Sequence, residues 1–496
     1  MATTVIRPPD AESAAGTPLS PRAMARAGGL HPFGVLVLLA GAFLPIADFF
    51  VVNVALPTID RTLRASGPML ELIVAGYGVA YASVLVLGGR LGDRYGRRRL
   101  FFGGLIAFIL ASLACGLSPT IELLIAARIV QGAAAAMLVP QVLATCHATL
   151  EGERKARALA LYGATSGIAA VIGQLAGGIL VHADIAGTAW RPIFLINIPV
   201  GLVVLAVARR VVPATRSEHP VGIDLLGTLL FGATLIALLV PLTEGEELGW
   251  PAWTWLVLVL AAGLAMTTLQ VERRLERRGV VPLLPPSVLR LPSMWRGLAL
   301  LLPFSVGFGA FMFVFALTTQ HGLHYDALKG GLAILPMAVL FLCGSVLSPR
   351  LIGRYGRGAM AAGGAVQAVG LALIITVMLT AWPHVGMLDL AGPLALSGAG
   401  GSMLFTGLFR VTLADVPAHH AGIGGGTLIT LQQSGLALGV ATFGTLFLAL
   451  EPHGVSHAFA AAIGAQLAIV LLLILGTRAL PAFTPSSNEE VIVADA

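Results

Sequence analysis

The stretch GRLGDRYGRRR, residues 89–99, places five of the 30 basic residues of this chain within eleven positions. It lies between an apolar run that ends near Leu87 and another that begins at Leu100. The whole 496-residue chain is 57% hydrophobic and only 11% charged, with a mean hydropathy of +0.90, whereas soluble domains carry about 25% charged residues. The composition therefore indicates an integral membrane protein, in which the charged stretch is a short turn between two membrane-spanning helices.

Apolar runs that can cross a hydrocarbon core of about 30 Å as helices recur along the whole chain. The sequence thus predicts an all-α integral membrane fold with 14 transmembrane helices. The predicted spans are 33–57, 69–88, 100–117, 120–145, 158–182, 193–212, 223–243, 254–270, 297–319, 328–347, 360–380, 388–410, 423–449 and 458–478.

The distribution of basic residues predicts the orientation of these helices. When the N-terminus is placed in the cytoplasm, the inner connections and tails hold 25 basic residues and the outer connections hold four. Because Lys and Arg favour the cytoplasmic side of a membrane, both termini are expected there. The formal net charge of +6 then reflects topology, and no nucleic-acid partner is expected.

The charged turn has a second copy, PRLIGRYGRG, at residues 349–358. Both copies follow an even-numbered helix, so the chain is predicted to contain two related bundles of six helices with two additional helices between them. Secondary transporters commonly have this plan, with the substrate site between the repeats. The expected parts are a cytoplasmic disordered tail (1–32), an N-terminal bundle (33–212), two inserted helices with a basic cytoplasmic loop (213–296), a C-terminal bundle (297–478) and a cytoplasmic tail (479–496).

Six further stretches accompany the turn in a fixed order. They are ADFFVVNVALP (47–57), RIVQGAAAA (128–136), GIAAVIGQLAGG (167–178), WRPIFLINIPVG (190–201), ERRLERRGVVPLLPPSVLR (272–290) and AGIGGGTLITLQQSGLALGVA (421–441). Together with the turn they resemble the signatures of the major facilitator superfamily, and specifically of its fourteen-helix drug:proton antiporter branch. The chain departs from that pattern at Gln174, where the branch usually has proline, and at Leu72, where it often has tryptophan.

The resemblance implies a major facilitator fold and a proton-coupled exporter that works by alternating access in the cell inner (plasma) membrane. It implies a lipophilic small-molecule substrate, neutral or monocationic, protons as the coupling ion, a monomer in the lipid bilayer, and no cofactor beyond the proton gradient. Export of a lipid or of a dedicated metabolite on the same fold stays open as an alternative. A membrane enzyme would need a nucleophile or a metal cluster, and the sequence contains neither an H-E-x-x-H nor a G-x-S-x-G motif, so no enzyme activity, catalytic residue or metal site is expected.

Asp48 and Arg128 are the charged residues expected at membrane depth. Each lies eight or nine residues from the outer end of its span, which corresponds to about 12–14 Å. An unpaired charge there costs at least ~2.5 kcal/mol, so the two are expected to pair or to line a cavity. A purely structural ion pair is one interpretation. In the other, burial favours the protonated carboxyl while Arg128 favours the carboxylate, so that Asp48 exchanges protons, and the proton competes with substrate for this site. The resemblance assigns proton coupling to these two positions.

Four other polar residues have predicted environments. Gln131 lies three residues after Arg128, on the same helix face, and is expected to touch substrate or to orient the arginine. Asn53 lies five residues after Asp48, on a different face, and is expected to bond a neighbouring helix. Glu71 and Glu122 lie near the outer surface and are expected to be solvated.

Several aromatic and small residues are candidates for the transport pathway. The predicted substrate cavity combines Asn53 and Gln131 with Phe49, Phe304, Phe308, Phe311 and Gln433, although phenylalanines facing lipid are equally compatible with the sequence. In the fifth span, Gly167, Gly173, Gly177 and Gly178 permit close helix contacts. These contacts are ordinary packing in one interpretation, whereas the resemblance implies that these glycines, with Gln174, form a seam between the bundles.

The residues of the charged turn have individual predicted roles. Gly89 is expected to allow a close helix approach and Gly96 a tight turn, while Asp93 can cap a helix or pair with Arg94 and Arg97. The resemblance implies that this loop is a gate that holds the cytoplasmic side closed against the thirteenth helix. A pure orientation signal is the alternative.

Overall fold

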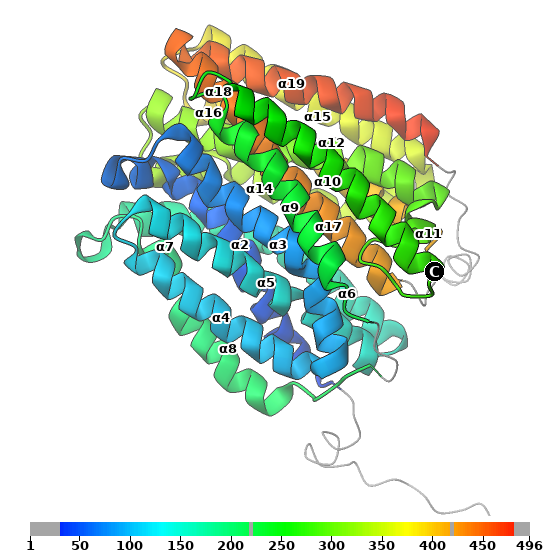
Figure 1. The fold of residues 1–496 in the computed structure, drawn as a ribbon. Coiled ribbons are helices and arrows are strands. Elements are labelled where there is room, and N and C mark those ends of the chain that lie inside the picture. Colours follow the sequence, from blue (N-terminus) through cyan, green and yellow to red (C-terminus); the bar gives the residue numbers. More distant parts are fainter. Residues whose placement is uncertain (1–29, 218–221, 417–420, 481–496) are drawn as a thin grey trace, which may run out of the picture.

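The computed structural model describes residues 30–217, 222–416 and 421–480, and these ranges consist of helices joined by short connections (Figure 1). Fourteen helices in the described ranges are long and apolar enough to cross a membrane, which confirms the predicted all-α fold. The first of them continues to Leu63 instead of ending near residue 57, because the helix accommodates Pro57 internally.

The helices of the first half pack against one another in one bundle, with the most extensive contacts between α3 and α5 and between α4 and α5. The short α7 and α8 together make the sixth span. The elements are α2 (Pro32–Leu63), α3 (Gly67–Tyr95), α4 (Arg97–Leu117), α5 (Ile121–Thr149), α6 (Gly152–His182), α7 (Pro192–Leu195) and α8 (Asn197–Val211).

The helices of the second half form the other bundle, seen above the first in Figure 1. Two of its spans contain a π-helical turn, η2 (Thr318–Gly322) after α12 and η4 (Val440–Gly444) between α17 and α18. The α-helices are α12 (Pro292–Leu317), α13 (Ala327–Ala333), α14 (Leu335–Tyr355), α15 (Arg357–Thr380), α16 (Met387–Thr412), α17 (Ala421–Gly439), α18 (Thr445–Leu450) and α19 (Val455–Gly476).

Both copies of the charged turn separate two helices at a single glycine. Gly96 ends α3 with φ +105°, and Gly356 ends α14 with φ +56°. L side chains rarely adopt these backbone angles, so glycine is needed at both positions. The prediction of a tight turn at Gly96 is therefore confirmed, and the equivalent turn recurs in the second bundle.

Glycines also set the distance between α3 and α5. A Cβ atom on Gly88 would lie 2.3 Å from the carbonyl oxygen of Ala136, and one on Gly132 would lie 2.3 Å from that of Tyr77. A Cβ on Gly89 would meet Pro140 at an ordinary 3.8 Å. The predicted role of Gly89 in close approach is therefore wrong, because the adjacent residue, Gly88, faces the neighbouring helix.

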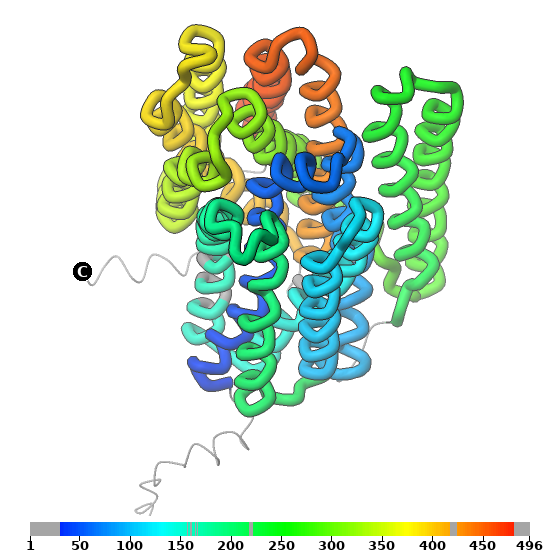
Figure 2. Tube along the Cα trace, turned by 90° about the vertical axis from the view of Figure 1, so that its left-hand side faces the viewer, coloured from blue at the N-terminus to red at the C-terminus, as the bar shows by residue number. Residues whose placement is uncertain are grey.

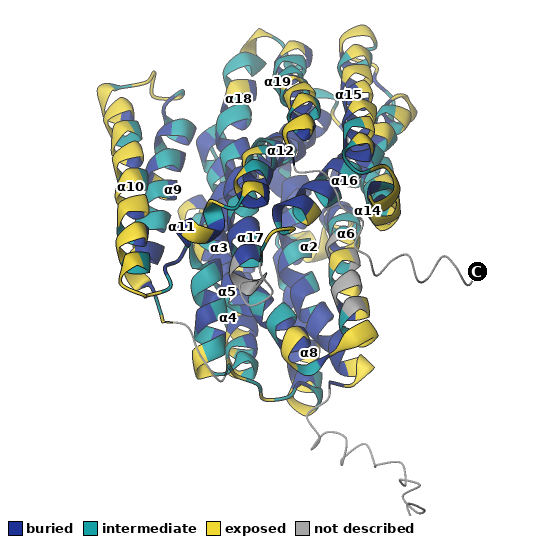
Figure 3. Ribbon diagram, turned by 90° about the vertical axis from the view of Figure 1, so that its right-hand side faces the viewer, coloured by how far each residue is buried: buried dark blue, intermediate teal, exposed yellow. Residues whose placement is uncertain are grey.

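The two inserted helices, α9 (Leu225–Glu244) and α10 (Ala252–Arg277), form a hairpin beside the bundles (Figure 2). Helix α9 packs against α3 and touches η4, while α10 packs mainly on α9 and presents exposed residues along its length (Figure 3). The exposed positions of α10 are largely apolar and include Leu256 and Val259. This distribution is that of a helix whose outer face lies in lipid.

Arg90 of the charged turn ties this hairpin to the first bundle. Its guanidinium donates hydrogen bonds to the backbone carbonyls of Gly222 and Val281, each at 3.0 Å, and to that of Pro282. The same connections hold Asp224, whose carboxylate caps α9 by accepting from the N–H of Gly227. One arginine of the turn thus fixes the segments that lead into α9 and out of α10.

Candidate functional site

Asp48 lies on α2 with its side chain inside the first bundle, and it is almost completely buried. Its Oδ1 accepts hydrogen bonds from Nε2 of Gln131 at 3.0 Å and from Nδ2 of Asn197 at 2.7 Å. Its Oδ2 accepts from Nη1 of Arg128, with which it forms an ion pair. Ser112 on α4 completes the network, since its hydroxyl accepts from both Gln131 and Asn197. Four elements, α2, α4, α5 and α8, therefore converge on one carboxylate.

Arg128 is fully buried on α5 and is held on several sides. Its Nε donates to the carbonyl of Ile73 at 3.2 Å, and its guanidinium carbon lies 4.2 Å from the ring centre of Tyr77 and 5.6 Å from that of Phe194. The hydroxyl of Tyr77 donates to the carbonyl of Pro45 at 3.0 Å. Arg128 Nη2 has no hydrogen-bond partner among the described residues. The cation is thus balanced by one carboxylate and two aromatic faces.

The sequence identified the central pair but not all of its partners. Gln131 was expected to touch substrate or to orient the arginine, and the second contact is present, since its Oε1 accepts from Arg128 Nη1 at 2.6 Å. Asn197, Ser112 and Tyr77 were not anticipated. Asn197 was the one with a sequence signal, because it is the polar residue in the apolar stretch FLINIPVG.

Asn53 does not join this network or bond a neighbouring helix as predicted. Its Nδ2 donates to the carbonyl of Phe49 on the same helix at 3.1 Å, and its Oδ1 has no partner among the described residues. A side chain that lies four residues after a carbonyl on its own helix can reach back to it, and here that local bond replaces an interhelical one.

The opposite face of α2 contacts the second bundle. The rings of Phe50 and Phe308 lie 6.5 Å apart, edge to face, and Nε2 of Gln320 donates to the carbonyl of Val54 at 2.8 Å. Helix α2 therefore carries Asp48 on a face within its own bundle and contacts the other bundle through different residues. A change at the ion pair can reach the boundary between bundles through this one helix.

The predicted aromatic residues do not form a single group. Phe304 and Phe308 stack at 6.5 Å and continue into Phe341 and Phe405, whereas Phe311 is fully buried against Phe315. Phe49 lies in the first bundle, with its ring 6.2 Å from that of Tyr77. Gln433 lies on α17, where α3 approaches closely at Gly78. Their assignment to a substrate cavity stays a prediction.

The fifth-span glycines lie at close contacts on two sides of α6. A Cβ on Gly167 would lie 2.8 Å from Leu342 of α14, and one on Gly178 would lie 2.8 Å from the carbonyl oxygen of Ala327 of α13. Gly173 and Gly177 instead approach the carbonyl oxygens of Ala47 and Val51 on α2, at 2.6 and 2.9 Å for a Cβ on each glycine. The helix is thus packed between α2 and the second bundle. Gln174, the replacement for proline, is buried, and its Nε2 donates to Met312 Sδ at 3.5 Å.

The residues of the charged turn are closely hydrogen-bonded and paired with one another. Nε and Nη2 of Arg97 donate to Oδ1 of Asp93 at 3.0 and 2.7 Å, so the predicted pairing holds for Arg97, while the guanidinium of Arg94 lies over the ring of Tyr95. The backbone of the turn is hydrogen-bonded to the segment at 215–217, through Arg97 N to the carbonyl of Thr215 and Ser217 N to that of Asp93. Helix α17 of the thirteenth span packs against α3, and the predicted contact of the turn itself with that helix stays a prediction.

The two outer glutamates have different environments. Glu122 is exposed in the first turn of α5, as predicted. The prediction for Glu71 is wrong, because its side chain is fully buried where α3 meets α18. Nothing in the local sequence around Glu71 indicates which elements cover it.

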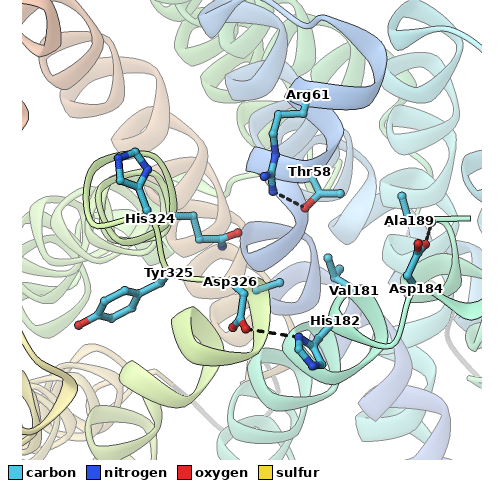
Figure 4. Close-up of a pocket in the computed structure, with 11 residues that line it drawn as sticks. Thr58, Arg61, Val181, His182, Asp184, Ala189, His324, Tyr325 and Asp326 are labelled. Carbon is cyan, nitrogen blue, oxygen red and sulfur yellow. Dashed lines mark hydrogen bonds and ion pairs between the residues drawn. The ribbon is translucent and has the colours of Figure 1, made fainter. Parts of the chain in front are cut away.

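The two bundles touch at the outer end of the molecule, which is the end that the distribution of basic residues predicts to be extracellular. Nδ1 of His182 lies 3.4 Å from Oδ2 of Asp326, and Nε2 of His321 lies 3.5 Å from Oδ2 of Asp60. A pocket of about 410 Å³ opens beside the first of these pairs, and His182, Asp326 and Arg61 are among the residues that line it (Figure 4). Neither Asp48 nor the predicted aromatic residues line it, so this pocket is separate from the buried network.

Tyr325 marks the second-bundle wall of this outer pocket. Its hydroxyl donates to the carbonyl of Val385 at 2.6 Å, and Lys329 Nζ lies 3.9 Å from its ring centre. Burial raises the pKa of Tyr325, and the nearby Asp389 adds to the effect. Within the described ranges no cluster of three or more His, Cys, Asp or Glu side chains could hold a metal ion.

Comparison with known proteins finds one family model and several relatives that cover most of this chain. Residues 38–440 match the family model of the Major Facilitator Superfamily. The "Probable actinorhodin transporter" of Streptomyces coelicolor is 35% identical over 84% of this chain and 72% of that protein. The "Methylenomycin A resistance protein" of the same organism is 32% identical over 88% and 91%. The "Multidrug resistance protein Stp" of Mycobacterium tuberculosis is 32% identical over 83% and 76%.

Solved structures share the fold at much lower identity. A POT family peptide transporter superposes with a TM-score of 0.65 at 14% identity, covering 94% of this chain and all of that chain. The xylose transporter XylE from E. coli, in a partially occluded inward-open conformation, superposes with a TM-score of 0.59 at 14% identity, over 89% and 97% of the two chains. These likenesses extend the fold assignment over nearly the whole chain.

Proposed function

Because this chain belongs to the major facilitator superfamily, and is therefore a multi-pass membrane transporter and not an enzyme, we propose that it is a proton-coupled exporter of lipophilic small molecules. The relatives named above are an antibiotic transporter, an antibiotic resistance protein and a multidrug resistance protein, which supports export as the direction. The proton gradient is then the energy source, and no cofactor is required.

The observation that carries the coupling proposal is the buried Asp48–Arg128 pair. Asp48 is a carboxylate on a membrane-spanning helix, with a buried cation beside it and hydrogen bonds from two further side chains, Gln131 and Asn197. A proton on Asp48 would cancel its charge and leave Arg128 without a counter-ion in a low-dielectric site. Arg128 and its surroundings would then have to rearrange, since an unpaired buried charge is strongly unfavourable.

The geometry argues for indirect coupling between proton and substrate. Asp48 faces α4, α5 and α8 inside the first bundle, so direct competition between proton and substrate for this carboxylate, the simplest antiport scheme, has no support here. Helix α2 supplies another route, because the same helix contacts the second bundle through Phe50 and Val54. Protonation would repack α2 against α5 and so change its fit at the boundary between bundles.

The membrane potential and the pH gradient can together supply the free energy that the proposed transport cycle requires. With the outer end closed by contacts such as Gly178 on Ala327, substrate enters from the cytoplasmic side. After outward opening, protonation from outside favours return to the closed arrangement. Each charge that moves across 100 mV contributes about 2.3 kcal/mol, to which a pH gradient adds. The proposed substrates are neutral or monocationic, and the proposed carrier is a monomer.

The names of the relatives favour a second candidate, a dedicated exporter of one metabolite. Two of them are named for single antibiotics, actinorhodin and methylenomycin A. In that case the coupling residues stay the same and only the substrate range is narrower. A panel of unrelated lipophilic compounds distinguishes the two, because a dedicated exporter moves one chemical class.

The decisive experiment is proton-driven accumulation of a fluorescent lipophilic cation, ethidium, in inverted vesicles, with proton flux recorded in parallel. Asp48→Asn should abolish both the accumulation and the substrate-dependent proton flux. Glu122→Gln, which removes an exposed carboxylate, is the matched control and should behave as the parent protein. Normal proton exchange in Asp48→Asn would show that the coupling site lies elsewhere.

A further inference from the structure

A second carboxylate lies buried at the boundary between the two bundles. Glu71 follows the first residue of α3 by four positions, about 6 Å along the helix from its outer end, and it is fully buried. Both of its carboxylate oxygens lie 3.1 Å from Oγ1 of Thr445, the first residue of α18. Since α3 belongs to the first bundle and α18 to the second, this contact must change when the outer end opens.

Gly444 makes this close packing possible. A Cβ at Gly444 would lie 3.0 Å from Glu71 Oε1 and 3.1 Å from the ring of Phe313. The π-helical turn η4 ends at this glycine and brings Thr445 onto the carboxyl group. The inserted hairpin closes a third side, because Oγ1 of Thr445 also lies 3.0 Å from the carbonyl oxygen of Leu242 on α9.

No cation offsets the charge that Glu71 would carry. Among the described residues, the charged groups that act on it are two more carboxylates, Glu244 at the end of α9 and Glu246 in the following turn. Other described charged groups on the outer halves of the elements around α3 are engaged elsewhere or exposed. Asp48 pairs with Arg128, Asp60 faces His321, Arg61 bonds its own helix at Pro57, and Glu451 lies near His321, while Arg64, Glu122 and Glu247 are exposed.

The count of hydrogens points to a protonated carboxyl. The Thr445 hydroxyl has one hydrogen, yet its oxygen lies within hydrogen-bonding distance of four acceptors: the two oxygens of Glu71 and the carbonyls of Leu242 and Ala441. If Glu71 is ionised, the one shared hydrogen of Thr445 is the hydrogen bond that the described residues give to this buried charge. If Glu71 carries a proton, its O–H donates to Thr445 Oγ1, and the threonine donates in turn to a carbonyl.

We propose that Glu71 is a second proton-binding residue of the transport cycle, protonated while the outer seam between α3 and α18 is closed and ionised when that seam opens to the external medium. The proposal rests on the proposed function, because it adds a proton to the same proton-driven cycle. Its direction agrees with export. External acid would protonate Glu71 in the open form and favour closure, which returns the transporter toward the cytoplasmic side.

The test measures the outer seam directly in the full-length protein. Spin labels at Pro119→Cys and His453→Cys, both exposed at the outer end of different bundles, report the distance between bundles in lipid nanodiscs. The three native cysteines, Cys115, Cys146 and Cys343, are replaced by alanine in this background. In the parent protein, the fraction with a long distance should increase from acidic to alkaline pH.

Glu71→Gln imitates the protonated acid and should favour the closed form across the whole pH range, with the remaining pH response being that of Asp48. Glu71→Asp, which can still ionise, should retain a response, and Glu122→Gln should match the parent. If Glu71→Gln opens with the same pH midpoint as the parent, the proposal is overturned.

A second measurement does not depend on the variant reaching a particular conformation. In an Asp48→Asn background, the infrared absorption of protonated carboxylic acids at neutral pH should lose one component when Glu71→Gln is added. A spectrum that does not change would also overturn the proposal. Neither measurement requires substrate or a functional Asp48, so failure here and failure of Asp48→Asn to impair export are separate results.

Discussion

Removal of Arg128 separates the structural from the coupling role of the buried pair. Arg128→Met leaves Asp48 fully buried with only the neutral donors of Gln131 and Asn197. Loss of one partner of a buried ion pair costs about 3–5 kcal/mol, which corresponds to a factor of roughly 10² to 10⁴ in the unfolding equilibrium constant. Reversible unfolding of the purified protein in mixed micelles measures this change.

The double variant Asp48→Asn/Arg128→Met removes both charges at once. Replacement of a buried ion pair by neutral groups of similar volume is often neutral or stabilising, so the double variant should recover most of the lost stability. Proton-driven export should nevertheless stay abolished, because no titrating group is left at the site. Stability and transport are measured on the same preparations.

Two outcomes would refute this reasoning. If Arg128→Met unfolds like the parent, the arginine does not compensate a buried charge, and the ion pair has no energetic importance. If the double variant is stable and still couples export to protons, the pair is a structural element only, and the proton travels by another group.

Three further predictions concern the contacts around the site. Gly178→Leu should prevent closure of the outer end, because a Cβ there would lie 2.8 Å from the carbonyl oxygen of Ala327. Cysteines introduced at the outer end should then be labelled faster by a membrane-impermeant reagent. Unchanged labelling would contradict this prediction. Arg90→Ala should release the inserted hairpin, since three hydrogen bonds from a charged donor are lost and each contributes about 1.5–3 kcal/mol. Limited proteolysis should then cut the 213–224 and 278–285 connections faster. An unchanged digestion pattern would show that packing alone holds α9. Asp93→Asn should change the free energy of unfolding by less than about 1 kcal/mol, because its ion pair with Arg97 is partly exposed and such surface pairs are weak. If the turn acts as a gate, the variant should nevertheless transport more slowly. A transport rate equal to that of the parent protein would favour the orientation signal alone.

Hydropathy, the repeated turn and the depth of two charged residues were sufficient to predict the architecture from the sequence. Long apolar runs must form helices in a bilayer, because no other open structure satisfies the backbone there, so the helix count follows from hydropathy. The repeated turn predicted two bundles, and in both copies a glycine, Gly96 or Gly356, ends the preceding helix. The common depth of Asp48 and Arg128 was also enough to anticipate their pairing, since few alternatives to pairing exist for charges in hydrocarbon.

Tertiary packing decided the rest. Most of these helices are apolar on all sides, so the sequence gives no period from which to infer which face meets a neighbour. For that reason the close approach falls at Gly88 and not at Gly89, Asn197 reaches Asp48 from a distant helix, and Asn53 bonds its own helix instead of another. Glu71 is the clearest case, because its burial depends on α9 and α18, elements that lie far along the chain. Hydropathy determines which segments enter the membrane, but only the mutual rotation and contact of the helices determine which polar groups are enclosed together.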